Sequence, residues 1–106
     1  MIRALLKRPG TKAVIQEFKN INEIYKTVSS VSVEFLTFSK KLDIGLYVND
    51  NGYYSGKSPN FMFNGHIIYG TVIFVGLDDE GATKRITNAQ IAFIENYLDH
   101  NLIRSD

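Results

Sequence analysis

The sequence has no cysteine, no tryptophan and only two prolines among its 106 residues. Without cysteine there is no disulfide, no thiolate metal ligand and no cysteine nucleophile, which suits a protein of a reducing cytoplasm. An excess of charge of one sign is also missing, since 12 basic residues stand against 11 acidic ones. The resulting net charge of +1 argues neither for nor against an acidic partner.

Long hydrophobic runs are absent as well. The longest apolar stretch, Ile67–Leu77, is about half the length of a membrane span and is interrupted by glycine. The opening residues, MIRALLKRPG, are too short and too interrupted for a signal peptide. With 44% hydrophobic and 22% charged residues, the composition is that of a globular protein. We therefore expect one domain over residues 1–106, soluble and cytoplasmic.

The N-terminal segment predicts a β-hairpin. Arg8-Pro9-Gly10-Thr11 has proline and glycine at the central positions of a type II turn, where glycine adopts a positive φ at little cost. This turn joins Met1–Lys7 to Ala13–Phe18 and places Leu6 opposite Ala13 on one face. The other face of the hairpin then carries basic side chains.

Capping signals and apolar stripes predict two helices. Asn20 opens the first, with Glu23 three residues later in a variant of the capping box. Thr87 and Gln90 form a T-x-x-Q capping box at the start of the second. Each helix has an apolar stripe at helical spacing: Ile21, Ile24, Tyr25 and Val28 in the first, and Ile91, Ile94, Leu98 and Leu102 in the second.

Three further strands are expected between the helices. Val31–Phe38 is apolar on both faces, which favours a central place in the sheet. Leu42–Val48 alternates between apolar and polar residues, and Ile67–Leu77 is typical of a buried strand. Glycine and proline interrupt Tyr53–Gly65, which predicts an irregular or short-stranded segment. The sequence thus predicts an α+β fold in the order ββαββ(loop)βα, with an antiparallel or mixed sheet of about five strands and both helices packed on it.

The spacing of polar residues does not predict a catalytic or metal site. His66 and His100 are expected on different elements, and no nucleophile can be paired with a base. Asp78–Gly81 lacks the ligand spacing of an EF-hand, which favours a solvated turn. There is no G-x-G-x-x-G motif and no Walker lysine to hold a phosphate. We therefore expect a protein that is not an enzyme and that uses no metal and no cofactor.

An aromatic segment is the first candidate for a contact surface. Tyrosine, phenylalanine and methionine are enriched at the centres of protein interfaces. The F-x-F alternation also allows the two phenylalanines to complete the core while the methionine points the other way. Both interpretations remain open at this point. The predicted partner-binding residues are Tyr53, Tyr54, Lys57, Phe61, Met62 and Phe63, with rim charges from Lys40 and Lys41.

A basic face on the first hairpin is the alternative. Lysine and arginine side chains in one patch can bind the phosphates of nucleic acid. Lysines on hairpin edges also prevent strand-to-strand aggregation, so the same residues have a structural explanation. The residues predicted for nucleic-acid binding are Arg3, Lys7, Arg8 and Lys12.

Several short motifs follow one another along the chain. They are MIRALLKRPG, DIGLYVNDNG, Ser58-Pro59-Asn60, the I-x-G-T-V-x-x-V-G pattern from Ile68 to Gly76, and TNAQI in the last helix. Together, over roughly residues 1 to 98, they resemble a family of small proteins of phages, plasmids and bacteria known as domain of unknown function 3846. Members often have a charged or aliphatic residue where Phe61 stands, so Phe61-Met62-Phe63 looks like an elaboration of this chain.

The resemblance implies a setting rather than an activity. Small accessory proteins of mobile elements commonly bind host defence enzymes, nucleic acid or signalling nucleotides, and anti-CRISPR inhibitors are typical of them. From this we expect a non-enzymatic binding protein in the bacterial cytoplasm that blocks a host defence protein by direct contact. A nucleic-acid-binding accessory protein and a binder of a small nucleotide signal are the alternatives, and homo-oligomerisation is left open.

Overall fold

The computed structural model describes residues 1–50 and 56–102 of the chain. Along them the elements are β1 (Ile2–Lys7), β2 (Val14–Phe18), α1 (Ile21–Val28), β3 (Val33–Ser39), β4 (Ile44–Asn49), β5 (Pro59–Phe63), β6 (His66–Tyr69), β7 (Val72–Leu77), β8 (Thr83–Lys84) and α2 (Asn88–Asn101). The predicted α+β class is confirmed. The predicted order is not matched, because the segment Tyr53–Gly65 contains the strand β5, the expected strand Ile67–Leu77 is divided into β6 and β7, and a short strand, β8, follows β7.

The main sheet is six-stranded, and each pair of neighbouring strands in it is antiparallel. Its strands lie in the order β2-β1-β7-β4-β3, and β8 pairs with the end of β7. Strands β5 and β6 pair with each other in a separate small sheet. Strand β7 is central, and all its residues are buried, which explains its apolar sequence.

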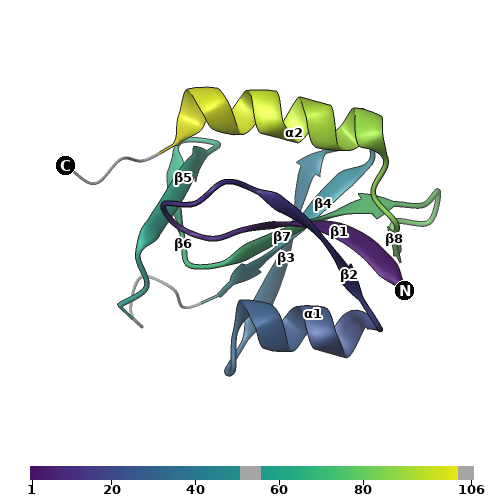
Figure 1. Ribbon diagram of the computed structural model, residues 1–106, viewed down its shortest axis with the longest axis horizontal. Helices are drawn as coiled ribbons and strands as arrows, with labels where there is room; N and C mark the ends of the chain where they lie inside the picture. The colour runs from purple at the N-terminus through teal and green to yellow at the C-terminus, as the bar shows by residue number, and fades with distance from the viewer. Residues whose placement is uncertain (51–55, 103–106) are drawn as a thin grey trace.

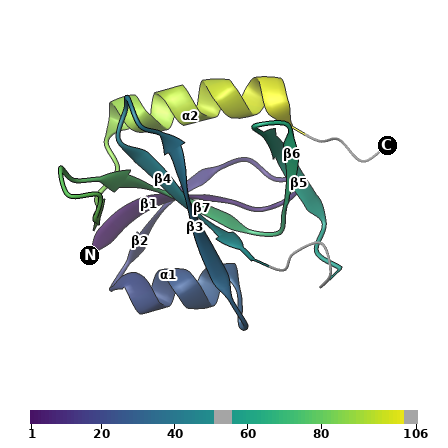
Figure 2. The same cartoon turned by 180° about the vertical axis from the view of Figure 1, so that it is seen from behind.

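The two helices lie on opposite faces of the main sheet. Helix α2 runs along one face and α1 along the other, so the sheet lies between two helical layers (Figure 1 and Figure 2). The hairpin β5–β6 stands at one end of the sheet, beside the C-terminal part of α2, where Phe61 forms a bridge with Leu102 (Figure 1).

Each face of the sheet has its own hydrophobic core. The core facing α2 consists of Leu5, Ile44, Leu46, Val48, Phe61, Phe63, Val72, Phe74, Ile86, Ile91, Ile94 and Leu98. The core facing α1 consists of Ala4, Leu6, Phe18, Ile24, Val28, Tyr47, Ile73, Val75 and Leu77. Strands β1, β7 and β4 therefore contribute alternate residues to both cores.

Both predicted helix starts are confirmed. The side chain of Asn20 accepts a hydrogen bond from the N–H of Glu23 over 3.0 Å. Thr87 and Gln90 form the complete capping box, with bonds of 3.1 and 2.9 Å between the side chain of each and the backbone N–H of the other. The buried stripe residues are Ile24 and Val28 in α1 and Ile91, Ile94 and Leu98 in α2, whereas Tyr25 and Leu102 are 40% and 41% exposed.

The register of the first hairpin differs by one residue from the prediction. The N–H of Thr11 donates to the carbonyl of Arg8 over 3.3 Å, as the predicted turn requires. However, Leu6 pairs with Val14 rather than with Ala13. The connection between the paired strands is therefore longer than the tight turn alone, and its extra residue shifts the pairing.

The predicted strand Ile67–Leu77 is divided into two strands. Gly70 has a φ of +82°, and the turn at this residue separates β6 from β7. Glycine adopts this left-handed conformation without the steric cost of a Cβ atom. As a result β6 pairs with β5, while β7 enters the main sheet.

Strand β3 lies at an edge of the sheet, contrary to the predicted central position. Among the described residues it pairs with β4 alone. Its side chains Leu36 and Phe38 pack against the core facing α2, which explains one of its two apolar faces. On the other face Val33 packs against the core facing α1, but Phe35 is 40% exposed, so burial does not account for Phe35.

Candidate functional site

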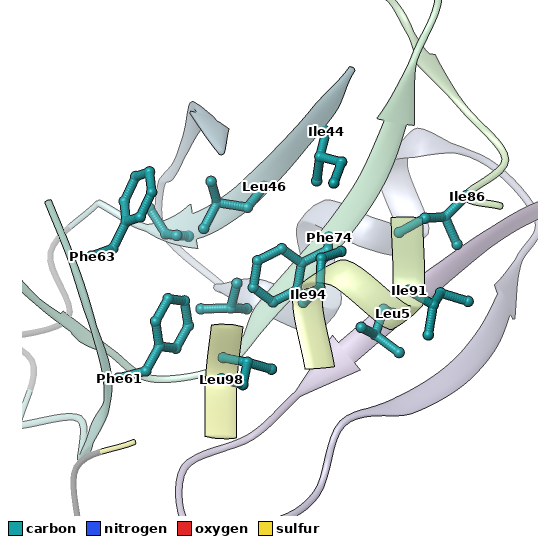
Figure 3. Packing of buried hydrophobic residues seen from close by; sticks show 12 residues of the cluster. Leu5, Ile44, Leu46, Phe61, Phe63, Phe74, Ile86, Ile91, Ile94 and Leu98 are labelled. Carbon is teal, nitrogen blue, oxygen red and sulfur yellow. The ribbon is translucent and has the colours of Figure 1, made fainter. Parts of the chain in front are cut away.

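The predicted contact residues Phe61 and Phe63 belong to the core. Phe61 is 0% exposed and Phe63 is 9% exposed, and Figure 3 shows both rings turned toward the other residues of the core facing α2. The prediction that they contact a partner is therefore wrong. Alternation along β5 directs both side chains inward, which is the second of the two interpretations that the F-x-F pattern allowed.

The other residues of the predicted aromatic segment are divided. Met62, on the opposite face of β5, is half-buried, and Lys57 is exposed. The carbonyl of Met62 accepts a hydrogen bond from the hydroxyl of Tyr97 over 2.8 Å. Tyr53 and Tyr54 lie outside the described residues.

A buried polar cluster fixes the hairpin β5–β6 to the main sheet. The side-chain amide of Asn60 donates to the carbonyls of Lys7 and Gly70 over 2.9 and 2.8 Å. Its oxygen accepts from the Lys7 ammonium over 2.9 Å, and the ammonium also donates to the carbonyl of Arg8 over 2.7 Å. Because both acceptors are neutral, burial lowers the pKa of the Lys7 ammonium. The cluster joins β1, β5 and the turn before β7, which is a structural role.

The basic face predicted on the first hairpin does not form as a single exposed surface. Lys7 is 2% exposed, because β1 lies between two other strands and its alternate side chains enter the two cores. The guanidinium of Arg3 donates to two oxygens at the start of α2, over 2.7 and 2.6 Å. Arg8 and Lys12 are exposed. Of the four residues predicted to bind nucleic acid, Arg8 and Lys12 are therefore the two with exposed cationic side chains.

An open groove with a volume of about 370 Å³ lies between α1 and β3. It is formed where α1 and the chain after it meet the outer strands of the sheet. Tyr25 follows the buried Ile24 in α1, and its ring packs against the ring of Tyr47 in β4. The lining residues are Tyr25, Lys26 and Ser29 at the end of α1, Val31, Val33 and Phe35 before and within β3, and Tyr47 of β4.

Three aromatic rings form the floor of the groove. Tyr47 is 6% exposed, and its ring lies 5.5 Å from that of Tyr25 and 4.8 Å from that of Phe35, measured between centroids. A Cβ atom on Gly45 would come within 2.3 Å of the Phe35 ring. Glycine at this position of β4 therefore creates the space in which the Phe35 ring lies.

The walls of the groove expose apolar surface to solvent. Val31 is 86% exposed, and Tyr25 and Phe35 are each 40% exposed. Lys26 is the one charged residue in the described lining. Burial raises the pKa of the Tyr47 phenol. The groove thus places exposed aromatic and aliphatic side chains beside a single cation, which makes it a candidate contact site.

The arrangement supplies binding groups rather than a reacting pair. The groove offers aromatic rings, two aliphatic side chains, an ammonium and hydroxyl groups, but its lining includes no carboxylate or imidazole that could act as a base. Within residues 1–50 and 56–102, no three His, Asp or Glu side chains gather where they could hold a metal ion. None of the helices in these ranges is long and apolar enough to cross a membrane.

Comparison with protein families gives the relationship of the chain. The family model described as Domain of unknown function (DUF3846) matches residues 2–100. The chain belongs to this family. Comparison with curated proteins and with solved structures found no match.

The motifs on which the resemblance rests have structural roles in this chain. Asn60, which ends Ser58-Pro59-Asn60, joins β5 to β1. Thr87 and Gln90, in TNAQI, cap α2. Gly45, in DIGLYVNDNG, provides the space for the Phe35 ring beside the groove. These motifs therefore specify the fold and the floor of the groove.

The sequence contained a signal for the groove in its pattern along β3. Val33 and Phe35 form an apolar face in addition to that of Leu36 and Phe38. Two apolar faces are found both in central strands, as the sequence predicts for this one, and in edge strands with a contact surface. Only the strand order, which depends on pairing between distant segments, separates these two possibilities.

Proposed function

We propose that this domain acts without catalysis by binding another protein, and that the groove between α1 and β3 is its contact surface. The observation that supports this proposal is the exposed apolar face of an edge strand. Val31 and Phe35 are exposed in the free protein. A partner that covers them would gain about 25 cal/mol of binding free energy for each Å² of apolar surface removed from water. Tyr25, Phe35 and Tyr47 are of the residue types enriched at interface centres.

Within this proposal the partner is a host protein. The domain, carried by a phage or another mobile element, blocks a defence enzyme such as a CRISPR effector in the bacterial cytoplasm. This setting is supported by the resemblance of the chain to proteins of mobile elements. The contact surface differs from the aromatic segment expected from the sequence, since Phe61 and Phe63 are buried.

Affinity capture with two matched valine variants tests the proposal. Val31→Asp places a charge in the groove at a residue that is 86% exposed, so the fold should tolerate it. Val14→Asp makes the same change on β2, at the opposite edge of the sheet, where the side chain is 49% exposed. The immobilised proteins are incubated with bacterial lysate, and the captured proteins are quantified by mass spectrometry.

We expect a protein captured by the wild type and by Val14→Asp to be depleted roughly thirtyfold or more with Val31→Asp, the effect of losing an interface anchor. Melting temperatures of both variants should stay within a few degrees of the wild type. Equal capture by all three proteins would show that the groove is not the contact surface.

A further inference from the structure

We infer that the groove receives an extended, acidic polypeptide segment that adds to the main sheet as a new strand beside β3. This inference rests on the proposed function and gives it a binding mode and a partner chemistry. It follows from three features that meet at this edge: the direction of the β3 backbone groups, the side chains of the same residues, and the charge of the groove.

Within residues 1–50 and 56–102, no strand pairs with the outer side of β3, where its backbone groups point outward at alternate residues. The N–H of Asp50 donates to the carbonyl of Ser32 over 3.3 Å, and this pair continues the register in which Val33 faces Asn49. In an antiparallel pair, residues that bond the partner strand alternate with residues whose groups point the other way. Since Ser32 bonds toward β4, the N–H and C=O groups of Val33 and Phe35 point to the open edge.

Val33 and Phe35 also direct their side chains into the groove. An extended segment that bonds to their backbone groups therefore lies directly beside the groove, and its alternate side chains reach the same face of the sheet. One partner strand would thus cover both the open edge of β3 and the exposed ring of Phe35. A folded surface without an extended segment would satisfy the apolar groups but not the backbone groups.

The open edge has limited protection against an added strand. Natural edge strands usually avoid pairing through proline, lysine or short length. From Val33 to Ser39, β3 has neither proline nor lysine, and its charged residue, Glu34, lies on the face opposite to the groove. The register shift between Thr37 and Ser39 interrupts the edge, so the added strand pairs along the N-terminal half of β3.

The charge of the groove selects an acidic segment. Lys26 is exposed in the last turn of α1, and the described lining residues include no carboxylate to neutralise it. An acidic side chain in the added strand can pair with this ammonium at the rim of the interface. The partner chemistry is therefore an extended segment with aliphatic or aromatic side chains at alternate positions and at least one aspartate or glutamate.

A displayed library of random peptides is the probe that tests this inference. Peptides selected on the immobilised wild-type protein should be enriched in acidic residues and in apolar residues at every second position. Lys26→Glu should weaken a selected acidic peptide about tenfold, since a rim ion pair becomes a repulsion. Lys12→Glu, the same change at an exposed lysine of the first hairpin, should leave the affinity unchanged.

Amide hydrogen exchange then reports the binding mode. A selected peptide should slow the exchange of the Val33 and Phe35 amides by roughly tenfold or more, and leave the Glu34 and Leu36 amides, which already bond to β4, unchanged. Selection of peptides without acidic preference, or protection at other residues, would overturn the inference. So would a dimer in sedimentation with Val33 and Phe35 protected in the free protein, because a second copy would then occupy the edge. If no peptide is enriched while Val31→Asp still abolishes protein capture, strand addition is wrong and the proposed function stands.

Discussion

Replacement of Asn60 by alanine should cause one of the largest stability losses available to a single substitution in this domain. The residue is 1% exposed and makes two hydrogen bonds to carbonyls and one to the Lys7 ammonium. A neutral buried hydrogen bond contributes about 1 kcal/mol net, and one to a charged group about 1.5–3 kcal/mol. Because the substitution also leaves two carbonyls without this donor, we expect the free energy of unfolding to fall by about 4 kcal/mol.

Urea denaturation followed by circular dichroism measures this loss. In thermal denaturation, a loss of about 1 kcal/mol in the free energy of unfolding lowers the melting temperature of a domain of this size by about 4–8 °C. The melting temperature of Asn60→Ala should therefore fall by about 15–30 °C. Asn22→Ala, at an exposed position of α1, is the matched control and should change the free energy by less than about 0.5 kcal/mol.

A double substitution separates the cluster from the rest of the core. Combining Asn60→Ala with Lys7→Met removes the ammonium together with its partner, so the combined loss should be smaller than the sum of the two single losses. A loss below about 1 kcal/mol for Asn60→Ala, or additive losses in the double variant, would refute the reasoning about a coupled buried cluster.

Three further predictions concern the core, the groove floor and the buried lysine. Phe61→Ala should lower the free energy of unfolding by about 3–5 kcal/mol and Met62→Ala by less than about 1.5 kcal/mol; similar losses in urea denaturation would contradict the inward direction of Phe61. Gly45→Ala should displace the Phe35 ring and destabilise the domain by about 1–3 kcal/mol, and unchanged ring resonances of Phe35 would contradict the close contact. Burial lowers the pKa of Lys7 below its usual 10.5, so the unfolded chain holds this proton more tightly than the folded protein. The stability of the wild type relative to Lys7→Met should therefore rise as the pH approaches 10.5, and a difference independent of pH would contradict a buried ammonium.

Local signals predicted the elements that depend on neighbouring residues. The capping box of Thr87 and Gln90 placed the start of α2, and the run that includes Val72–Leu77 was correctly expected to be buried. The pairing of β5 with β6 as a separate hairpin was not predicted, because glycine and proline weaken the strand pattern in this part of the sequence. Pro59 is the first residue of β5, and Asn64-Gly65 forms the two-residue turn with φ values of +51° and +76°, both permitted positions.

Features that depend on the pairing of distant strands could not be predicted from local signals in the sequence. Lys7 is buried because β7 pairs with β1 on the side opposite to β2, and nothing near Lys7 in the sequence indicates that neighbour. Strand β4 has β3 on one side and β7 on the other, which leaves β3 at the end of the strand order. The groove depends on that same order, so the residues that line it could be recognised as apolar but not as exposed.

The most direct test of the account is amide hydrogen exchange of the free protein along β3. The groove lies beside β3, which is an edge among the described residues, with the backbone groups of Val33 and Phe35 directed away from β4. We predict that the amides of Val33 and Phe35 exchange roughly a hundredfold or more faster than those of Glu34 and Leu36, which bond to β4. Equal protection of all four amides would mean that another strand already covers this edge, and would contradict the assignment of the groove as a free binding site.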